Sequence, residues 1–199
     1  MFRVLHIGCG TKTKQQTTAG FNRPDWEEIR LDIDPAVKPD IVGSMTDMQA
    51  VPAASMDALF SSHNIEHLYA HEVPIALAEF LRVLKADGFA VITCPDLQSV
   101  SALIAADKLT EPAYQSPAGP IMPLDILYGH RPQLAAGNLY MAHKCGFTER
   151  VLVATLQQAG FKTVASLGRG TPHFDLWALA SKTERDEEAM RRLAQGHFP

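Results

Sequence analysis

The sequence has few cysteines, and those it has form no recognisable framework. Cys9, Cys94 and Cys145 are odd in number and far apart, and no C-x-x-C pair occurs. Disulfide-stapled secreted domains and zinc ribbons both need closely spaced, even sets of cysteines. The cysteine pattern therefore excludes both classes and favours a reducing compartment, so we expect a cytoplasmic protein.

Surplus positive charge and long hydrophobic runs are also missing. The formal net charge is -4 at pH 7 over 199 residues. Phosphate binding needs a basic face, so a nucleic-acid partner is disfavoured, although a modified tRNA or rRNA base stays open. No apolar run is long enough to cross a bilayer, and the first residues lack the pattern of a signal peptide. We expect one globular domain, residues 1–199, with a small-molecule partner and no membrane contact.

What the sequence does contain is a series of short apolar segments, which predict alternating strands and helices. Buried strands are expected at residues 2–7, 28–33, 40–42, 56–61 and 89–93, followed by a hairpin at 161–167 and 174–181. Helices are expected at 73–85, 97–106, 148–158 and 184–195. Strand–crossover–strand units that end in a hairpin indicate an α/β fold: a doubly wound, mostly parallel seven-stranded sheet with an antiparallel edge hairpin.

Two segments and the last helix leave questions about this plan. Residues 11–28 are polar and lack an apolar stripe, so the first crossover is either a loop or a short irregular helix. Residues 107–146 contain five prolines and no sustained periodicity. A stretch of this length inside a domain is typical of a binding lid or substrate loop. The predicted helix 184–195 is highly charged, so we expect it on the surface or against a partner, such as a second copy in a homodimer.

A glycine turn and an acid follow the first two predicted strands. Gly8, Cys9 and Gly10 end the first strand, and Asp32 stands at the end of the second. In a doubly wound sheet the ligand lies at the carboxyl ends of the strands, near the point where strand order reverses. Glycine lets a ligand approach the backbone, and a carboxylate can accept both hydroxyls of a ribose. The pair predicts a site for a nucleoside-bearing cofactor.

Five segments, in this order, resemble the motifs of the class I S-adenosylmethionine-dependent methyltransferases. They are His6–Gly10, the acid Asp32, Ile41–Met48, Met56–Leu68 and Leu81–Phe89. A later run, His143–Thr148, is similar to one in a group of small predicted methyltransferases. The resemblance implies a Rossmann-like methyltransferase fold and S-adenosylmethionine as cofactor. It also implies transfer of the sulfonium methyl group to an acceptor that the sequence does not identify.

The resemblance, read with the residues themselves, gives a candidate site. The cofactor-binding candidates are Gly8, Cys9, Gly10, Asp32, Ile33, Ser44, Met45, Asp47, Ser62 and His63. His63 and His143 are candidate general bases for an acceptor that must lose a proton. The candidate substrate contacts, in or beside the 107–146 segment, are His130, Arg131, Tyr140 and Lys144. The two cations among them would suit an acidic group on the acceptor.

Three positions depart from the family's pattern. His6 stands where an acid is usual, and Lys12 stands where a third glycine is frequent. Ser44 replaces the usual acid of the adenine loop, although Asp47 is near. A non-catalytic adenosyl-binding or interaction domain of the same fold is therefore a second hypothesis. A nicotinamide enzyme is disfavoured, because Thr13 occupies the third glycine position of G-x-G-x-x-G.

A hypothesis from another class comes from three residues in the fourth predicted strand-loop segment. His63, Glu66 and His67 fit H-x-x-E-H, a helical zinc-binding pattern, and so suggest a zinc-dependent hydrolase. A pattern with three fixed positions matches many sequences by chance. The surrounding strand–loop–helix order fits the cofactor interpretation better, so we expect no metal.

Overall fold

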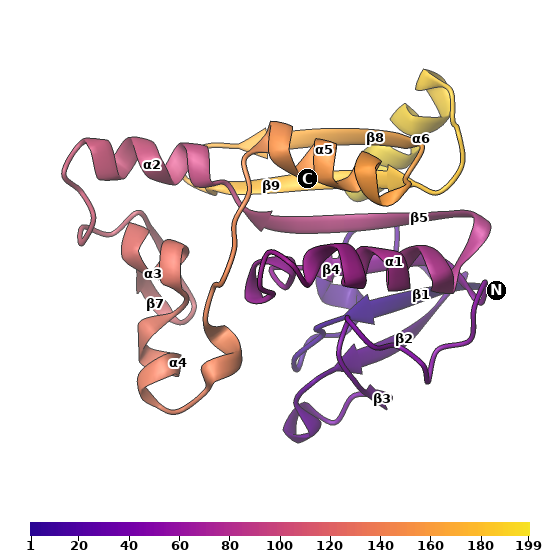
Figure 1. Cartoon of the computed structure of the whole chain (residues 1–199), viewed down its shortest axis with the longest axis horizontal. Coiled ribbons are helices and arrows are strands. Elements are labelled where there is room, and N and C mark those ends of the chain that lie inside the picture. The colour runs from indigo at the N-terminus through magenta and orange to yellow at the C-terminus, as the bar shows by residue number, and fades with distance from the viewer.

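The computed structural model describes residues 1–199 and is built around a seven-stranded sheet (Figure 1). The strand order is β3-β2-β1-β4-β5-β9-β8. The strands are β1 (Phe2–Ile7), β2 (Trp26–Asp32), β3 (Ile41–Val42), β4 (Met56–Ser62), β5 (Leu84–Pro95), β8 (Thr163–Arg169) and β9 (Asp175–Ser181). The first five are parallel, and β9 pairs antiparallel with both β5 and β8. The predicted α/β fold with an edge hairpin is confirmed.

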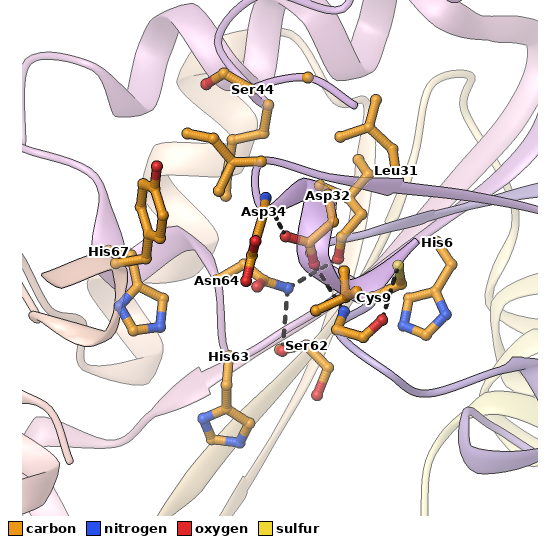
Figure 2. Close-up of a pocket in the computed structure, with 18 of the residues that line it drawn as sticks. His6, Cys9, Leu31, Asp32, Asp34, Ser44, Ser62, His63, Asn64 and His67 are labelled. Atoms are coloured by element: carbon orange, nitrogen blue, oxygen red, sulfur yellow. Dashed lines mark hydrogen bonds between the residues drawn. The ribbon is translucent and has the colours of Figure 1, made fainter. Parts of the chain in front are cut away.

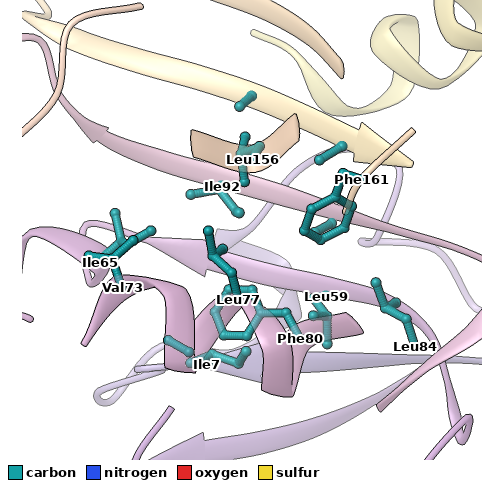
Figure 3. Close-up of a cluster of buried hydrophobic side chains, with 14 of the residues drawn as sticks. Ile7, Leu59, Ile65, Val73, Leu77, Phe80, Leu84, Ile92, Leu156 and Phe161 are labelled. Carbon is teal, nitrogen blue, oxygen red and sulfur yellow. The ribbon is translucent and has the colours of Figure 1, made fainter. Parts of the chain in front are cut away.

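One face of the sheet is covered by helices α1 (Val73–Val83) and α5 (Glu149–Ala159). Leu77 and Phe80 of α1 and Leu156 of α5 are fully buried against strand residues such as Leu59 and Ile92 (Figure 3). Each such side chain contributes about 1.5–3 kcal/mol by leaving water. None of the helices is long and apolar enough to cross a membrane.

The other face lacks the crossover helix that usually joins β1 to β2. Residues 11–25 form a loop with a single 3-10 turn, η1 (Lys14–Gln16). This face is covered instead by Phe21 in the loop and by Met190 of α6 (Glu187–His197). Both side chains pack against the buried strand residues of this face. The Gly20 amide donates to the carbonyl oxygen of Gly196 at 2.7 Å and fastens the loop to the helix.

The last helix was predicted to lie on the surface or against a partner; its outer side is exposed, and its apolar side packs against the chain itself. Its apolar side is used within the chain, where Met190 and His197 are buried. Its outer side carries the ion pairs Glu187–Arg191 and Glu188–Arg192. A charged sequence conceals the packing role because only one narrow side of the helix is apolar.

The 107–146 segment is also more ordered than its sequence suggests. It follows α2 (Leu97–Ala105) and holds a small hairpin, β6 (Tyr114–Ser116) with β7 (Gly119–Ile121), and the helices α3 (Pro123–Tyr128) and α4 (Arg131–Ala135). A separate apolar cluster supports it, including Val100, Ile121 and Phe174. Each piece is too short to show a period, and two of the five prolines, Pro123 and Pro132, begin helices rather than break them. The segment lies beyond the carboxyl ends of the strands (Figure 1).

Smaller differences concern boundaries. Helix α1 ends at Val83, two residues earlier than predicted, because β5 already begins at Leu84. Pairing with β4 is irregular there, since Met56 pairs with Leu84 and Ala58 pairs next with Phe89. Asp96 caps α2 and accepts hydrogen bonds from the Gln98 and Ser99 amides.

The junction between α6 and the first loop buries a histidine. His197 is 6% exposed, and its Nδ1 lies 2.8 Å from Thr18 Oγ1. The rings of Phe21 and Phe89 lie 4.2 and 5.1 Å from the imidazole, measured between centroids. Burial lowers the pKa of His197 to about 4. The folded protein therefore keeps this imidazole neutral at pH values where an unfolded chain would protonate it.

We expect His197 to make folding pH-dependent. Between pH 7 and pH 5 the His197 imidazole becomes protonated in the unfolded chain but stays neutral in the folded chain. The free energy of unfolding should therefore fall by about 2 kcal/mol. Urea unfolding followed by tryptophan fluorescence at both pH values measures this change. The variant His197→Gln should lose that part of the pH dependence, and His173→Gln, at an exposed position, should keep it. Equal pH dependence in wild type and His197→Gln would contradict the assignment.

Candidate functional site

A cavity of about 550 Å³ opens at the carboxyl ends of β1, β2 and β4. Strand order reverses between β1 and β4, so the cavity lies where doubly wound sheets bind ligands. Its walls come from the glycine turn after β1, the end of β2, residues 43–46, residues 62–64 and the end of the 107–146 segment. Figure 2 shows His63 and His67 on the side of the cavity away from His6.

Gly8 and Gly10, in the first turn, are glycine for different structural reasons. Both have positive φ, 61° at Gly8 and 54° at Gly10. A Cβ on Gly8 would lie 2.0 Å from Oδ1 of Asn64, whose Nδ2 donates to the carbonyl oxygen of Ile7 at 2.9 Å. A Cβ on Gly10 would meet no atom within 4 Å. Gly8 makes room for an asparagine, whereas Gly10 has open space in front of it.

Asp32 is tied directly to this turn. Its Oδ2 accepts the Gly10 amide at 2.7 Å, and its Oδ1 accepts the Asp34 amide at 2.9 Å (Figure 2). The residue is 8% exposed. Each carboxylate oxygen has two lone pairs, so each can still accept one hydroxyl from the cavity. The glycine turn and the acid, predicted to share one site, do line the same cavity.

His6, which stands where the family usually has an acid, has an acid beside it. Its Nδ1 lies 2.7 Å from Oε1 of Glu28 on the neighbouring strand β2; the His6 side chain is buried, and that of Glu28 is 11% exposed. Burial lowers the pKa of His6 against the opposing effect of Glu28. The strand below the glycine turn thus has a carboxylate supplied from β2 instead of β1.

Arg30 holds the turn from the other side and was not predicted. Its guanidinium donates to the carbonyl oxygens of Gly10 at 2.6 Å, Lys12 at 3.1 Å and Lys38 at 3.0 Å. These bonds fix the segment in which Lys12 replaces a third glycine. The only sequence signal was a lone arginine two residues before Asp32.

Residues after β3 form part of the cavity wall. Ser44, Met45 and Thr46 line it, together with Ile33, whose side chain is exposed there. Asp47 lies outside the cavity and borders a separate shallow pocket with Glu79 and Arg82. The reason is a tight turn in which Ser44 and Asp47 pair with each other.

The end of β4 supplies Ser62, His63 and Asn64 to the cavity. His63 has a φ of 55°, which lies in a region that residues with a Cβ rarely adopt. Its amide donates a hydrogen bond to the carbonyl oxygen of Thr93 at 2.9 Å. The side chain is 48% exposed. The sequence predicted Ser62 and His63 here but assigned no role to Asn64.

The 107–146 segment brings two of its candidate residues to the cavity. Tyr140 and Lys144 line it, and the Lys144 Nζ lies 4.8 Å from the centre of the Tyr69 ring. His130 and Arg131 do not line it. Arg131 instead pairs with the buried Asp125 at 2.6 Å and stabilises the α3–α4 corner.

A histidine–carboxylate cluster lies beside the cavity. Glu66 and His67 belong to a 3-10 turn, η3 (Ile65–His67), so they lack the α-helical setting of the H-x-x-E-H pattern. His67 lines the cavity; His143 does not, and its ring centre lies 4.9 Å from that of His67. Burial alone would raise the pKa of the Glu66 carboxyl, but His63, His67 and His143 around it hold that pKa below its ordinary value. Burial lowers the pKa of His143.

Residues 5–92 match a family model described as a methyltransferase domain. Comparison with curated proteins gives no sequence match. Among solved structures, the chain is similar to a SAM-dependent methyltransferase from Archaeoglobus fulgidus, with a TM-score of 0.60 and 17% identity, covering 91% of this chain and 86% of that one.

Two further structures show the same fold. One is the Burkholderia thailandensis 1,6-didemethyltoxoflavin-N1-methyltransferase, solved with 1,6-didemethyltoxoflavin and S-adenosylhomocysteine bound. Its TM-score is 0.57 at 16% identity, covering 92% of this chain and 71% of that one. The other is a SAM-dependent methyltransferase from Aquifex aeolicus, with a TM-score of 0.55 at 13% identity, covering 92% and 82% of the two chains.

The matched residues contain the end of β1, all of β2, β3 and β4 and most of β5, and with them nearly all the strand ends around the cavity. The cofactor that this family uses is S-adenosylmethionine. The cavity fits it, with open space at Gly10 and two free acceptor positions on Asp32. Residues 5–92 thus match the methyltransferase domain family, and the fold of the chain is that of SAM-dependent methyltransferases.

Proposed function

We propose that this protein transfers a methyl group from S-adenosylmethionine, bound in the cavity, to a small-molecule acceptor that enters beside the 107–146 segment. The observation that carries the proposal is the 2.7 Å hydrogen bond from the Gly10 amide to Asp32. It places an open turn and a partly free carboxylate in one cavity, which is what an adenosyl ligand needs.

The proposed cofactor contacts follow from this bond. The Gly8–Gly10 turn would lie under the methionine part, and Asp32 would accept the ribose hydroxyls through its free lone pairs. Ile33 and Met45 offer apolar surface to the adenine, with Ser44 at its edge. Cys9, Ser62 and His63 complete the wall. Asp47, outside the cavity, leaves this set.

The chain's own part in the reaction is to position the acceptor and keep water out. The bound cofactor supplies a methyl group on a good leaving group, so alignment and exclusion of water carry most of the catalysis. His63, Tyr140 and Lys144 also line the cavity. This wall offers hydrogen bonds and one positive charge, and so suits a small polar or anionic acceptor.

We expect the change Asp32→Ala to weaken binding of S-adenosylhomocysteine by about 10- to 100-fold, because it removes charge-assisted hydrogen bonds and frees the Gly10 turn. Isothermal titration calorimetry of the purified chain measures this. Asp57→Ala is the matched control: Asp57 also accepts a backbone amide, from Arg3 at 2.8 Å, but at the opposite end of the strands. Undiminished affinity in Asp32→Ala, with the control behaving alike, would refute the proposed cofactor site.

We expect substitution of Gly8 to affect mainly the stability of the fold and substitution of Gly10 to affect mainly cofactor binding. In Gly8→Ala the new methyl group collides with Asn64, so the melting temperature should fall strongly. In Gly10→Ala the methyl group has room and carries a backbone cost of about 1–2 kcal/mol, while it fills space at the cavity. Affinity for S-adenosylhomocysteine should therefore fall more than stability does.

Differential scanning fluorimetry and calorimetry on both variants test this pair. The double variant Gly8→Ala/Asn64→Ala should be more stable than the sum of the single changes predicts, because it relieves the collision. Strict additivity, or a Gly10→Ala protein with full affinity, would speak against the distinct roles of the two glycines.

A further inference from the structure

Glu66 is a buried carboxylate without a hydrogen bond. The residue is 1% exposed, and neither Oε1 nor Oε2 has a hydrogen-bond donor. The nearest nitrogen of an ion-pair partner, Nδ1 of His63, lies 3.4 Å from Oε1, beyond normal hydrogen-bond length. An ionised carboxylate in such a place is costly unless a cation is bound to it.

Two histidines beside Glu66 are oriented by the backbone. His67 Nδ1 lies 3.1 Å from the carbonyl oxygen of Ala142, and His143 Nδ1 lies 2.8 Å from that of Ile126. A carbonyl oxygen can only accept, so each Nδ1 carries the proton. In the neutral ring the free lone pair is then on Nε2. Histidines that bind metals are commonly held in this way, with the other ring nitrogen donating to a carbonyl.

The three side chains converge. One possible ligand atom from each of Glu66, His67 and His143 lies within 4.8 Å of the other two. Two imidazoles and a carboxylate form a ligand set typical of zinc and of other divalent transition metals. Three ligands from the protein leave coordination positions free for a further molecule.

We propose that Glu66, His67 and His143 bind one divalent transition-metal ion at the edge of the cavity. The set differs from the H-x-x-E-H hypothesis, because His143 from the 107–146 segment replaces His63. It also changes our expectation of no metal. Metal binding stands on these residues alone; only its relation to the acceptor rests on the proposed function.

The position of the site suggests which acceptors it serves. His67 lines the cavity as well as belonging to the cluster, so the ion would border the space proposed for the acceptor. A metal with free positions binds hydroxyl, carboxylate or amine groups and lowers the pKa of a bound hydroxyl. The acceptor class would then be a small molecule that offers an oxygen or nitrogen ligand.

Metal content of the untagged full-length chain tests the site. After treatment with EDTA and dialysis, titration with Zn²⁺ should show one ion bound per chain, and Co²⁺ should give the visible absorption of a His–carboxylate complex. In His143→Ala and in Glu66→Gln we expect Zn²⁺ affinity to fall by about 100-fold or more. His130→Ala, in the same segment but outside the cluster, should bind as wild type does, and so should Cys145→Ser.

The outcomes separate the two proposals. Absence of stoichiometric Zn²⁺ and Co²⁺ binding in wild type, or binding that survives both cluster variants, would overturn the metal site. Circular dichroism on the variants distinguishes lost ligands from lost fold, and Glu66→Gln keeps the side-chain volume where His143→Ala does not. Titration of metal-free protein with S-adenosylhomocysteine tests the cofactor site by itself, since Asp32 lies outside the cluster.

Discussion

The bond between the Gly10 amide and the Asp32 carboxylate is the constraint on which the site depends. It joins the ends of two neighbouring parallel strands, and it fixes a turn whose positive φ values would otherwise be free to vary. Arg30 holds the same turn through the carbonyl oxygens of Gly10 and Lys12, and Asn64 holds the strand end below it. The cavity is therefore preorganised by hydrogen bonds within the protein, and a ligand need not order the loop when it binds.

Sequence reasoning succeeded where one local signal sufficed. Short stretches of sequence indicate the strand ends, the turn at Gly8 and Gly10 and the acid Asp32, and the alternation of strands and helices indicates a doubly wound, mostly parallel sheet. The placement of Asp32 against Gly10 needed only the rule that carboxyl ends meet at one edge. Asp47 was misplaced because a tight turn from Ser44 to Asp47 cannot be read from composition.

Contacts between distant segments were out of reach. The pairing of His6 with Glu28 depends on how β1 and β2 are aligned, and the role of α6 depends on a loop almost a full chain length away. In both cases a feature of the sequence looks anomalous when it is considered alone. One is a histidine where the family usually has an acid, and the other is a highly charged helix with no evident partner. The structure shows that each anomaly is compensated by an element that no periodicity connects to it.

The side of the cavity that we propose for the acceptor is built by such a distant contact. The backbone oxygen of Glu66 accepts the amides of Lys144 at 2.8 Å and Cys145 at 3.2 Å, so the end of the 107–146 segment is docked on η3 by main-chain bonds. This docking brings Lys144 to the cavity and His143 to the cluster, while the Glu66 carboxylate remains without a hydrogen bond. Glu66 thus anchors the segment with its backbone, and its carboxylate stays available for the cation that we propose. The docking joins segments that no local sequence pattern connects. For that reason the sequence predicted the proposed cofactor side of the cavity better than the proposed acceptor side.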